Sequence, residues 1–318
     1  MYTFKYALTR LGLMVFTYMA ILILCFVLIK LLPLPDVKTF GQDANLIEMR
    51  RKLLGYDKPI MEQFGIFLKS VITRWDWGVG EQIYRGQDVG KVFFDKMPIT
   101  MLLNLYSIII SIPIGLGLGI YAALRKNKWD DHVISTGVMI MVSVPAFIYA
   151  FLVQYLFCFK LGWFPFQMEA SKDYFTWTMF VSLCPAIMSL SFGTIAGYTR
   201  GTRAELSEVL TNDFMLLART KGLTKGQAVM RHALRNAMVV IFPSILSAFI
   251  DIFGGAVITE RVFSIPGLGN LYINAINNLD YNFFMIATAF YTLIGLLSNL
   301  VYDISITFID PRIRVGAK

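Results

Sequence analysis

The stretch ITMLLNLYSIIISIPIGLGLGIYAAL, at residues 99–124, decides the fold class. It contains no Asp, Glu, Lys, Arg or His, and its only polar side chains are those of Thr, Asn, Ser and Tyr. A helix that crosses the hydrocarbon core of a bilayer needs about 20 consecutive, mostly apolar residues. The stretch therefore predicts a membrane-spanning helix.

Five further runs of similar length and composition lie along the chain, at residues 11–32, 133–159, 175–199, 237–259 and 283–309. Their few ionisable residues are Lys30, Asp251 and Asp303. A soluble chain of this size could not bury six such runs, so we expect an all-α integral membrane protein with six transmembrane helices. The first run is too long for a signal peptide and lacks a small-residue cleavage site after it, which favours a retained span.

The overall composition supports this class. Of the 318 residues, 56% are apolar and only 16% are charged, whereas soluble domains carry about 25% charged residues. This balance excludes a disordered chain and a small disulfide-stapled secreted domain, and it argues against a soluble enzyme. Two His and three Cys residues offer little material for a metal site. We expect no catalytic residues, no metal ligands and no nucleic-acid partner.

The basic residues predict the orientation, because cytoplasmic loops are rich in Lys and Arg. The segments at one side of the predicted spans hold most of them: Lys5, Arg10, Arg125, Lys126, Lys128, Arg200, Arg203, Arg219, Lys221, Lys225, Arg231, Arg235, Arg312, Arg314 and Lys318. The opposite short loops, at 162–174 and 260–282, hold only Lys172 and Arg261. Both termini are therefore predicted to be cytoplasmic, in a multi-pass membrane protein.

The same topology gives a predicted division of the chain. Residues 1–32 form the cytoplasmic N-terminus and first span, and residues 33–97 form an extracytoplasmic segment. Residues 98–318 form a five-span core that includes a cytoplasmic loop at 200–236. The net charge of +8 then reflects cytoplasmic loops rather than nucleic-acid binding.

The loop at 200–236 carries the strongest local signals. Apolar residues recur at helical spacing and predict one amphipathic helix: Leu206, Val209, Leu210, Phe214 and Leu217. Gly222 interrupts that helix, and Thr224 with Gln227 reads as a capping box that starts a second helix running into the fifth span. Two helices that meet at a glycine would make a rigid knob able to transmit a push. The alternative is a basic, solvated loop.

Residues 218–238, ARTKGLTKGQAVMRHALRNAM, resemble the cytoplasmic loop of the membrane subunits of ABC importers. The generic pattern of those subunits is kept at Ala218, Gly222 and Leu234, but its Glu, Ile and Pro are missing. The longer string resembles the oligopeptide, dipeptide and nickel branch. The stretches at 54–68, 198–214, 254–271 and 310–314 resemble that branch as well, and the long segment after the first span is typical of its B-type subunits.

The resemblance implies the fold of a type I ABC importer permease, a place in a bacterial inner or plasma membrane, and a set of partners. These are a second, C-type permease subunit, two ATP-binding subunits and an extracytoplasmic peptide-binding protein. No phosphate-binding loop is found, so ATP and Mg²⁺ would bind to the partner ATPases and this chain would hold no cofactor. The residues expected to couple to an ATPase are Leu217, Ala218, Arg219, Lys221, Gly222, Leu223, His232 and Arg235.

The expected cargo is an oligopeptide or dipeptide. Nickel or another small cargo on the same scaffold is the alternative. A gradient-driven transporter or channel is more remote, because it would need a paired ionisable relay or an inverted repeat, and neither is evident.

Three ionisable residues are candidates for the translocation pathway or its gate. Asp251 would line the path or form an interhelical hydrogen bond. Glu260 and Arg261 would seal an outer gate, contact the binding protein or form a solvated surface pair. Other signals concern packing: Gly115 and Gly119 predict a close helix contact. Pro113, Pro145, Pro185 and Pro243 predict kinks within spans.

Overall fold

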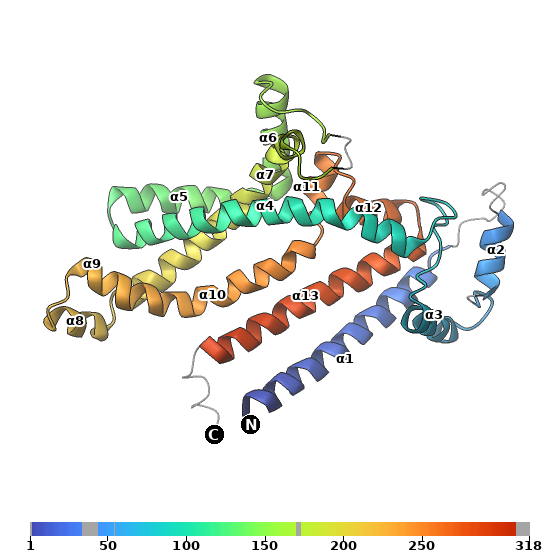
Figure 1. Ribbon diagram of the computed structural model, residues 1–318, viewed down its shortest axis with the longest axis horizontal. Helices are drawn as coiled ribbons and strands as arrows, with labels where there is room; N and C mark the ends of the chain where they lie inside the picture. The colour runs from blue at the N-terminus through green and yellow to red at the C-terminus, as the bar shows by residue number, and fades with distance from the viewer. Residues whose placement is uncertain (1, 34–43, 54, 170–172, 310–318) are drawn as a thin grey trace. The chain divides into compact units, whose positions relative to one another are not determined.

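The computed structural model describes residues 2–33, 44–53, 55–169 and 173–309, and this part of the chain is built from helices (Figure 1). Its only extended pairings are two isolated bridges, Val79 with Asp88 and Gly80 with Arg85. The predicted all-α class is confirmed. The predicted closing motif at 310–314 and the loop residue Lys172 lie outside the described residues.

Five helical stretches among the described residues are long and apolar enough to cross a membrane, and they match five of the six predicted spans. They are Ala7–Lys30 within α1 (Tyr2–Lys30), α4 (Val89–Leu124), α7 (Trp177–Val209), Lys225–Val262 and α13 (Tyr281–Ile309). The stretch Lys225–Val262 comprises α9 (Lys225–Ala228), a π-helical turn (Val229–Ala233), α10 (Leu234–Ile250), a short 3₁₀ turn (Asp251–Phe253) and α11 (Val257–Val262).

The third predicted span, 133–159, is not one straight helix. It is broken into α5 (Trp129–Ser143) and a second part, Ala146–Lys160, which begins with α6 (Ala146–Val153), and the two parts are bent by 100°. Val144 has extended backbone angles, and Pro145 stands at the N-cap of α6. A proline disfavours helical angles at the preceding residue and cannot donate a backbone hydrogen bond, so the helix ends and restarts here.

The described chain divides into two compact units. One unit contains residues 2–7, the described part of 102–252 and residues 297–309. Here α4 lies against α7 at two glycines: a Cβ at Gly115 would lie 2.7 Å from the Tyr198 Cβ, and one at Gly119 would lie 2.6 Å from the Thr202 Cβ. The close contact predicted for these glycines is confirmed, since neither position has room for a side chain.

The second unit contains residues 8–33, the described part of 44–101 and residues 253–296. Aromatic side chains fill its core, where Phe26 of α1, Phe64 of α3, and Phe93 of α4 are buried together with Phe283 of α13. The remaining helices of this unit are α2 (Ala44–Leu53), α3 (Ile60–Arg74) and α12 (Leu268–Asn277). The topological division made from the sequence, at residues 32 and 97, stays a prediction.

Candidate functional site

The 200–236 loop folds as a helical knob, but its first part differs from the prediction. The expected single amphipathic helix through Leu206 and Leu217 is wrong, because α7 ends at Val209 and α8 (Asp213–Thr220) begins after Asn212. Asn212 is extended, and the Thr211 hydroxyl donates to the Glu208 carbonyl over 2.7 Å. Such local bonds from side chains to the backbone compete with the hydrogen bonds that would continue the helix. The apolar residues keep helical spacing on both sides of the break, so their pattern alone predicts one helix.

The glycine turn of the knob forms as predicted. Gly222 has φ +88°, a left-handed conformation that favours glycine. The Leu223 N–H donates to the Ala218 carbonyl over 3.3 Å and the Gly222 N–H to the Arg219 carbonyl over 3.0 Å. These two bonds are the pair that closes a helix in a Schellman motif. They fix the direction in which the chain leaves α8.

The capping box that starts the second helix is also confirmed. The Thr224 hydroxyl accepts from the Gln227 N–H over 3.3 Å, and the Gln227 side-chain carbonyl accepts from the Thr224 N–H over 3.1 Å. The chain then continues through α9 and the π-helical turn into α10. As a result, the knob is joined at one end to α7 and at the other to α10, both within candidate membrane spans.

The interior of the knob is closed by small side chains. Ala218 of α8, Ala228 of α9 and Ala233 of the π turn are buried in one cluster with Leu206 of α7 and Ala123 of α4. Alanines bring helix backbones close together and lose little side-chain entropy on burial. The knob is therefore held firmly against the ends of α4, α7 and α10.

Most of the residues predicted to couple to an ATPase lie on the outer surface of the knob, and one lies in its interior. Leu217, Arg219, Lys221, Gly222, His232 and Arg235 are exposed, Leu223 is half-buried, and Ala218 is buried in the interior. The exposed rim includes two neighbouring leucines, with Leu216 exposed by 66% and Leu217 by 56%. Leu216 is not among the predicted site residues, although its position directly beside Leu217 is a usable signal.

A partly buried ion pair, not expected from the sequence, ties α5 to α7 beside the knob. Asp131 is buried and accepts from the Arg203 guanidinium, with an Nη2 to Oδ2 distance of 2.8 Å, and from the Asn127 N–H at 2.9 Å. Asp131 is in the first turn of α5, where a carboxylate is favoured by the helix dipole. The sequence could indicate that Asp131 stands near the start of a helix. It could not indicate that Asp131 pairs with Arg203, which is 72 positions away.

Asp251 lies where α10 ends, and its side chain is exposed. Its carboxylate lies close to the Ser298 hydroxyl of α13. Ser247 and Ser298 also bond to each other's carbonyls, at 3.1 and 3.4 Å, and the Tyr198 hydroxyl donates to the Ser244 carbonyl at 3.1 Å. We call Tyr198, Ser244, Ser247, Asp251 and Ser298 the polar seam. The seam joins α7, α10 and α13 within candidate spans.

A pocket of about 400 Å³ continues from the polar seam along α7. Tyr198 and Ser244 line it together with Gly197, Gly201 and Glu205 of α7. A Cβ at Gly197 or Gly201 would meet no atom within 4 Å. Unlike Gly115 and Gly119, these glycines therefore border open space.

Glu260 and Arg261 do not form the solvated surface pair that the sequence left open. Glu260 of α11 is fully buried and accepts from the Thr100 hydroxyl over 2.9 Å and from the Asn270 N–H over 3.0 Å. Arg261 is exposed and donates to the Asn274 side chain of α12 over 2.9 Å. The two neighbours thus have separate structural roles, because consecutive residues point away from each other on a helix.

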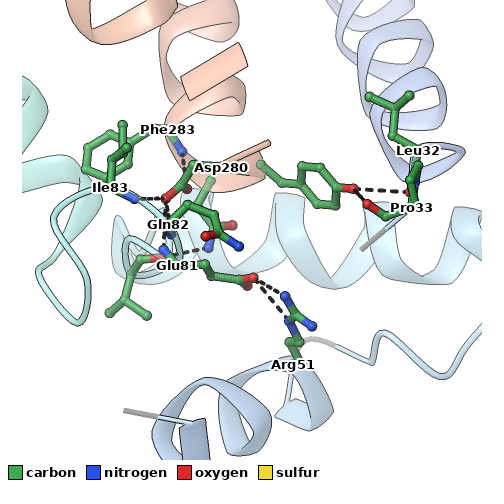
Figure 2. A network of polar contacts seen from close by, with 11 residues as sticks. Leu32, Pro33, Arg51, Glu81, Gln82, Ile83, Asp280 and Phe283 are labelled. Atoms are coloured by element: carbon green, nitrogen blue, oxygen red, sulfur yellow. Dashed lines mark hydrogen bonds and ion pairs between the residues drawn. The ribbon is translucent and has the colours of Figure 1, made fainter. Parts of the chain in front are cut away.

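Asp280, between α12 and α13, is the centre of a second buried network (Figure 2). One of its carboxylate oxygens accepts from the backbone N–H groups of Glu81, Gln82 and Ile83, at 2.9, 2.8 and 3.1 Å. The other accepts from the Phe283 N–H at 3.4 Å. Burial raises the pKa of Asp280, although these N–H donors favour the ionised form.

The same network reaches two further parts of this unit. Glu81 forms a buried ion pair with Arg51 of α2, and the Tyr281 hydroxyl donates to the carbonyls of Leu32 and Pro33 at 3.1 and 2.8 Å (Figure 2). Three segments that are distant from it in the sequence, residues 32–33, α2 and residues 81–83, are therefore fixed around the start of α13. We call this arrangement the Asp280 turn. Sequence reasoning missed it, and only the capping position of Asp280 before α13 gave a local signal.

Comparison with known proteins assigns the chain to a transport family. Residues 115–315 match the family of the "binding-protein-dependent transport system inner membrane component". The chain belongs to this family. It is therefore a membrane permease component of a binding-protein-dependent transport system, as the resemblance at 218–238 had implied.

Curated relatives match along nearly the whole chain. The dipeptide transport system permease protein DppB of Lactococcus lactis is 30% identical over 311 residues, covering 98% of this chain and 99% of that protein. DppB of Bacillus subtilis is 31% identical over 319 residues, covering 99% of each. The glutathione transport system permease protein GsiC of Escherichia coli K12 is 30% identical over 313 residues, covering 98% and 99%. The permease interpretation and the type I importer fold are thus confirmed.

Proposed function

We propose that this permease subunit imports dipeptides or other short peptides and is driven by partner ATPases that dock on the knob at 213–235. It would pair with a second, C-type permease subunit and receive cargo from an extracytoplasmic peptide-binding protein. The catalytic ATP and Mg²⁺ belong to the two ATP-binding subunits. The inner membrane would hold the chain with both termini in the cytoplasm.

The observation that carries the coupling proposal is the contrast between the rim and the interior of the knob. The interior is closed by buried alanines, a Schellman motif and a capping box. The rim exposes Leu216 and Leu217 next to Arg219 and Lys221. Exposed apolar side chains within a basic rim suit a protein partner, because association buries apolar area while the charges set its orientation.

The knob can transmit movement because of how it is attached. ATP binding draws two ATPase subunits together, and a knob seated on one of them would move with it. Since buried contacts join the knob to the ends of α4, α7 and α10, the displacement would pass into helices that cross the membrane. Bistable packing of such elements is the physical means by which a small shift becomes a change of state.

For the translocation path we propose the polar seam and its pocket. Polar residues within membrane spans face a cavity or a partner rather than lipid. The exposed Asp251 at one end of the seam and Glu205 in the pocket both suit the positively charged amino group of a peptide. Outside the seam, buried Glu260 would hold the turn between α11 and α12 in place. Exposed Arg261 would then be available for contact with the binding protein.

Peptide cargo is proposed because two of the relatives named above are dipeptide permeases and the third is a glutathione permease. The test is uptake of isotope-labelled dipeptides and of labelled glutathione by cells in which the gene is deleted and then restored. Loss and rescue of dipeptide uptake is expected. Rescue of glutathione uptake alone would identify glutathione rather than dipeptides as the cargo. Rescue of neither uptake would contradict peptide import.

Gly222 tests the coupling part in the same cells. Gly222→Glu places a bulky, β-carbon-bearing side chain at φ +88° on the rim, so we expect uptake to fall by at least tenfold. Gly222→Asn is the matched variant, because asparagine tolerates the left-handed conformation and should retain most uptake. Normal uptake by Gly222→Glu at normal expression would contradict docking at this turn.

A further inference from the structure

The turn between α4 and α5 contains both paired and unpaired basic residues. Arg125 lies 3.7 Å from Asp130, and Arg203 of α7 is bonded to Asp131. These carboxylates follow directly on the turn, yet Lys126 and Lys128 form no ion pair or side-chain hydrogen bond with any of the described residues. Their charges are therefore not neutralised within this part of the chain.

Both lysines line a pocket of about 530 Å³ between the turn and the knob. Arg219 of α8 and Lys225 of α9 line it too, and neither has an ion-pair partner among the described residues. The single carboxylate in the lining is that of Asp213. Four cations and one carboxylate, from three segments, thus surround one concave space, and such an excess of positive charge attracts anions.

One wall of the pocket is apolar and continues along α4. Ala123 and Leu124 line the pocket, and Leu118, Tyr121 and Leu124 are exposed on α4 below it. Because residues three and four apart share a helix face, these exposed side chains form a stripe that leads from the membrane-spanning part of α4 to the pocket. An acyl chain lying along this stripe would place its headgroup among the four cations.

Aromatic residues mark the level of the pocket relative to the membrane. Tyr121 is 45% exposed at the end of α4, and Trp129, the first residue of α5, is 77% exposed. Exposed Tyr and Trp gather at the boundary between hydrocarbon and headgroups. The two lysines lie between them in the chain, so we infer that they stand at the level of the lipid headgroups.

We propose that this pocket binds the phosphate headgroup of an anionic phospholipid, with Lys126 and Lys128 as the principal ligands. Basic pockets at the ends of membrane helices favour such headgroups. The exposed apolar stripe on α4 argues for a lipid rather than for an acidic segment of a soluble partner. The proposal stands on the geometry of the turn and does not require that the cargo is a peptide or that an ATPase docks on the knob.

The test is native mass spectrometry of the full-length chain in detergent, titrated with phosphatidylglycerol or with phosphatidylcholine. The wild type should retain one phosphatidylglycerol and no phosphatidylcholine. Lys126→Gln with Lys128→Gln should weaken phosphatidylglycerol retention roughly 30-fold, the factor expected for loss of two surface cations. The charge-conserving pair Lys126→Arg with Lys128→Arg should retain the lipid.

Two controls test whether the lipid binds at this pocket, rather than through the overall charge of the protein, and whether its acyl chain is needed. Lys52→Gln with Lys58→Gln removes the same charge from exposed lysines outside the pocket and should leave retention unchanged. Inorganic phosphate at millimolar concentration should not displace the lipid, because it lacks the acyl chain.

Three outcomes would overturn the proposal. One is equal retention of phosphatidylglycerol by the wild type and the Lys126→Gln, Lys128→Gln variant, and another is equal retention of both lipids. The third is displacement of phosphatidylglycerol by inorganic phosphate. If the variant keeps the lipid but no longer co-purifies with ATP-binding subunits, the pocket serves those subunits instead.

Discussion

The knob and the Asp280 turn are both compact turns between helices, but they are built in opposite ways. The knob has an apolar interior of small side chains and keeps its charged groups on the outside. The Asp280 turn buries its charged groups and satisfies them with backbone N–H donors and an ion pair (Figure 2). The first construction leaves a surface free for partners, whereas the second fixes several segments in one arrangement.

This difference has a consequence for mutation. A buried polar centre is costly to break because its partners are left without hydrogen bonds. An apolar, alanine-filled shell with an exposed rim tolerates changes on the rim, so those changes report on binding rather than on folding. Substitutions at the Asp280 turn should therefore cause large losses of stability, whereas substitutions on the rim of the knob should affect partner binding and leave stability nearly unchanged.

The largest effect on stability is expected at the Asp280 turn. Asp280→Ala leaves the buried N–H groups of Glu81, Gln82 and Ile83 without their acceptor, and it should cost about 3–5 kcal/mol of unfolding free energy. Asp280→Asn keeps a side-chain oxygen and should cost about 1 kcal/mol. Thermal unfolding of the full chain in detergent measures both. Equal and small shifts of the unfolding temperature for the two variants would show that Asp280 does not hold this turn together.

A smaller effect is expected where α4 meets α7, beneath the knob. Gly119→Val introduces a side chain where a Cβ would already lie 2.6 Å from Thr202, so overpacking should cost about 2–3 kcal/mol. Gly117→Val is the matched control, because a Cβ there meets no atom within 4 Å. The difference between the unfolding midpoints of the two variants measures the cost of crowding the contact between α4 and α7 at Gly119. If both variants unfold alike, α4 and α7 are not packed as described.

The smallest effect is expected at the capping box of the knob. Thr224→Ala removes the acceptor of the Gln227 N–H and should cost about 1 kcal/mol. Thr220→Ala, in the last turn of α8, removes only a bond to the Leu217 carbonyl and should be close to neutral. Hydrogen exchange of the Gln227 amide reads out the local effect. Unchanged exchange in Thr224→Ala would show that the box contributes nothing to the knob.

The sequence predicted what is local. The left-handed turn at Gly222 and the bonds between Thr224 and Gln227 involve neighbours in the chain, so residue types and spacing were enough. The membrane-spanning helices were predictable for a related reason, since bilayer thickness sets the length of an apolar run. Close packing at Gly115 and Gly119 followed from their spacing on one helix face.

The sequence could not predict what depends on distant partners or on a choice between allowed conformations. Asp280 bonds to residues nearly 200 positions earlier, and no local pattern encodes that pairing. Pro145 signalled a kink, but proline is tolerated in membrane helices, so a bend of 100° was not readable. The break at Asn212 was hidden because apolar residues keep helical spacing on both sides of it.

If the exposed rim of the knob docks an ATPase, Leu217→Glu should interrupt the coupling between ATP hydrolysis and uptake. The side chain is 56% exposed, so the substitution should not disturb folding. Met61→Glu, at a position 58% exposed on α3, is the matched control. In the importer reconstituted with all its subunits in vesicles, ATP-driven dipeptide uptake should fall at least tenfold for Leu217→Glu and stay within twofold for Met61→Glu. Uptake by Leu217→Glu equal to that of the wild type, at equal incorporation, would show that the ATPase does not dock on this rim.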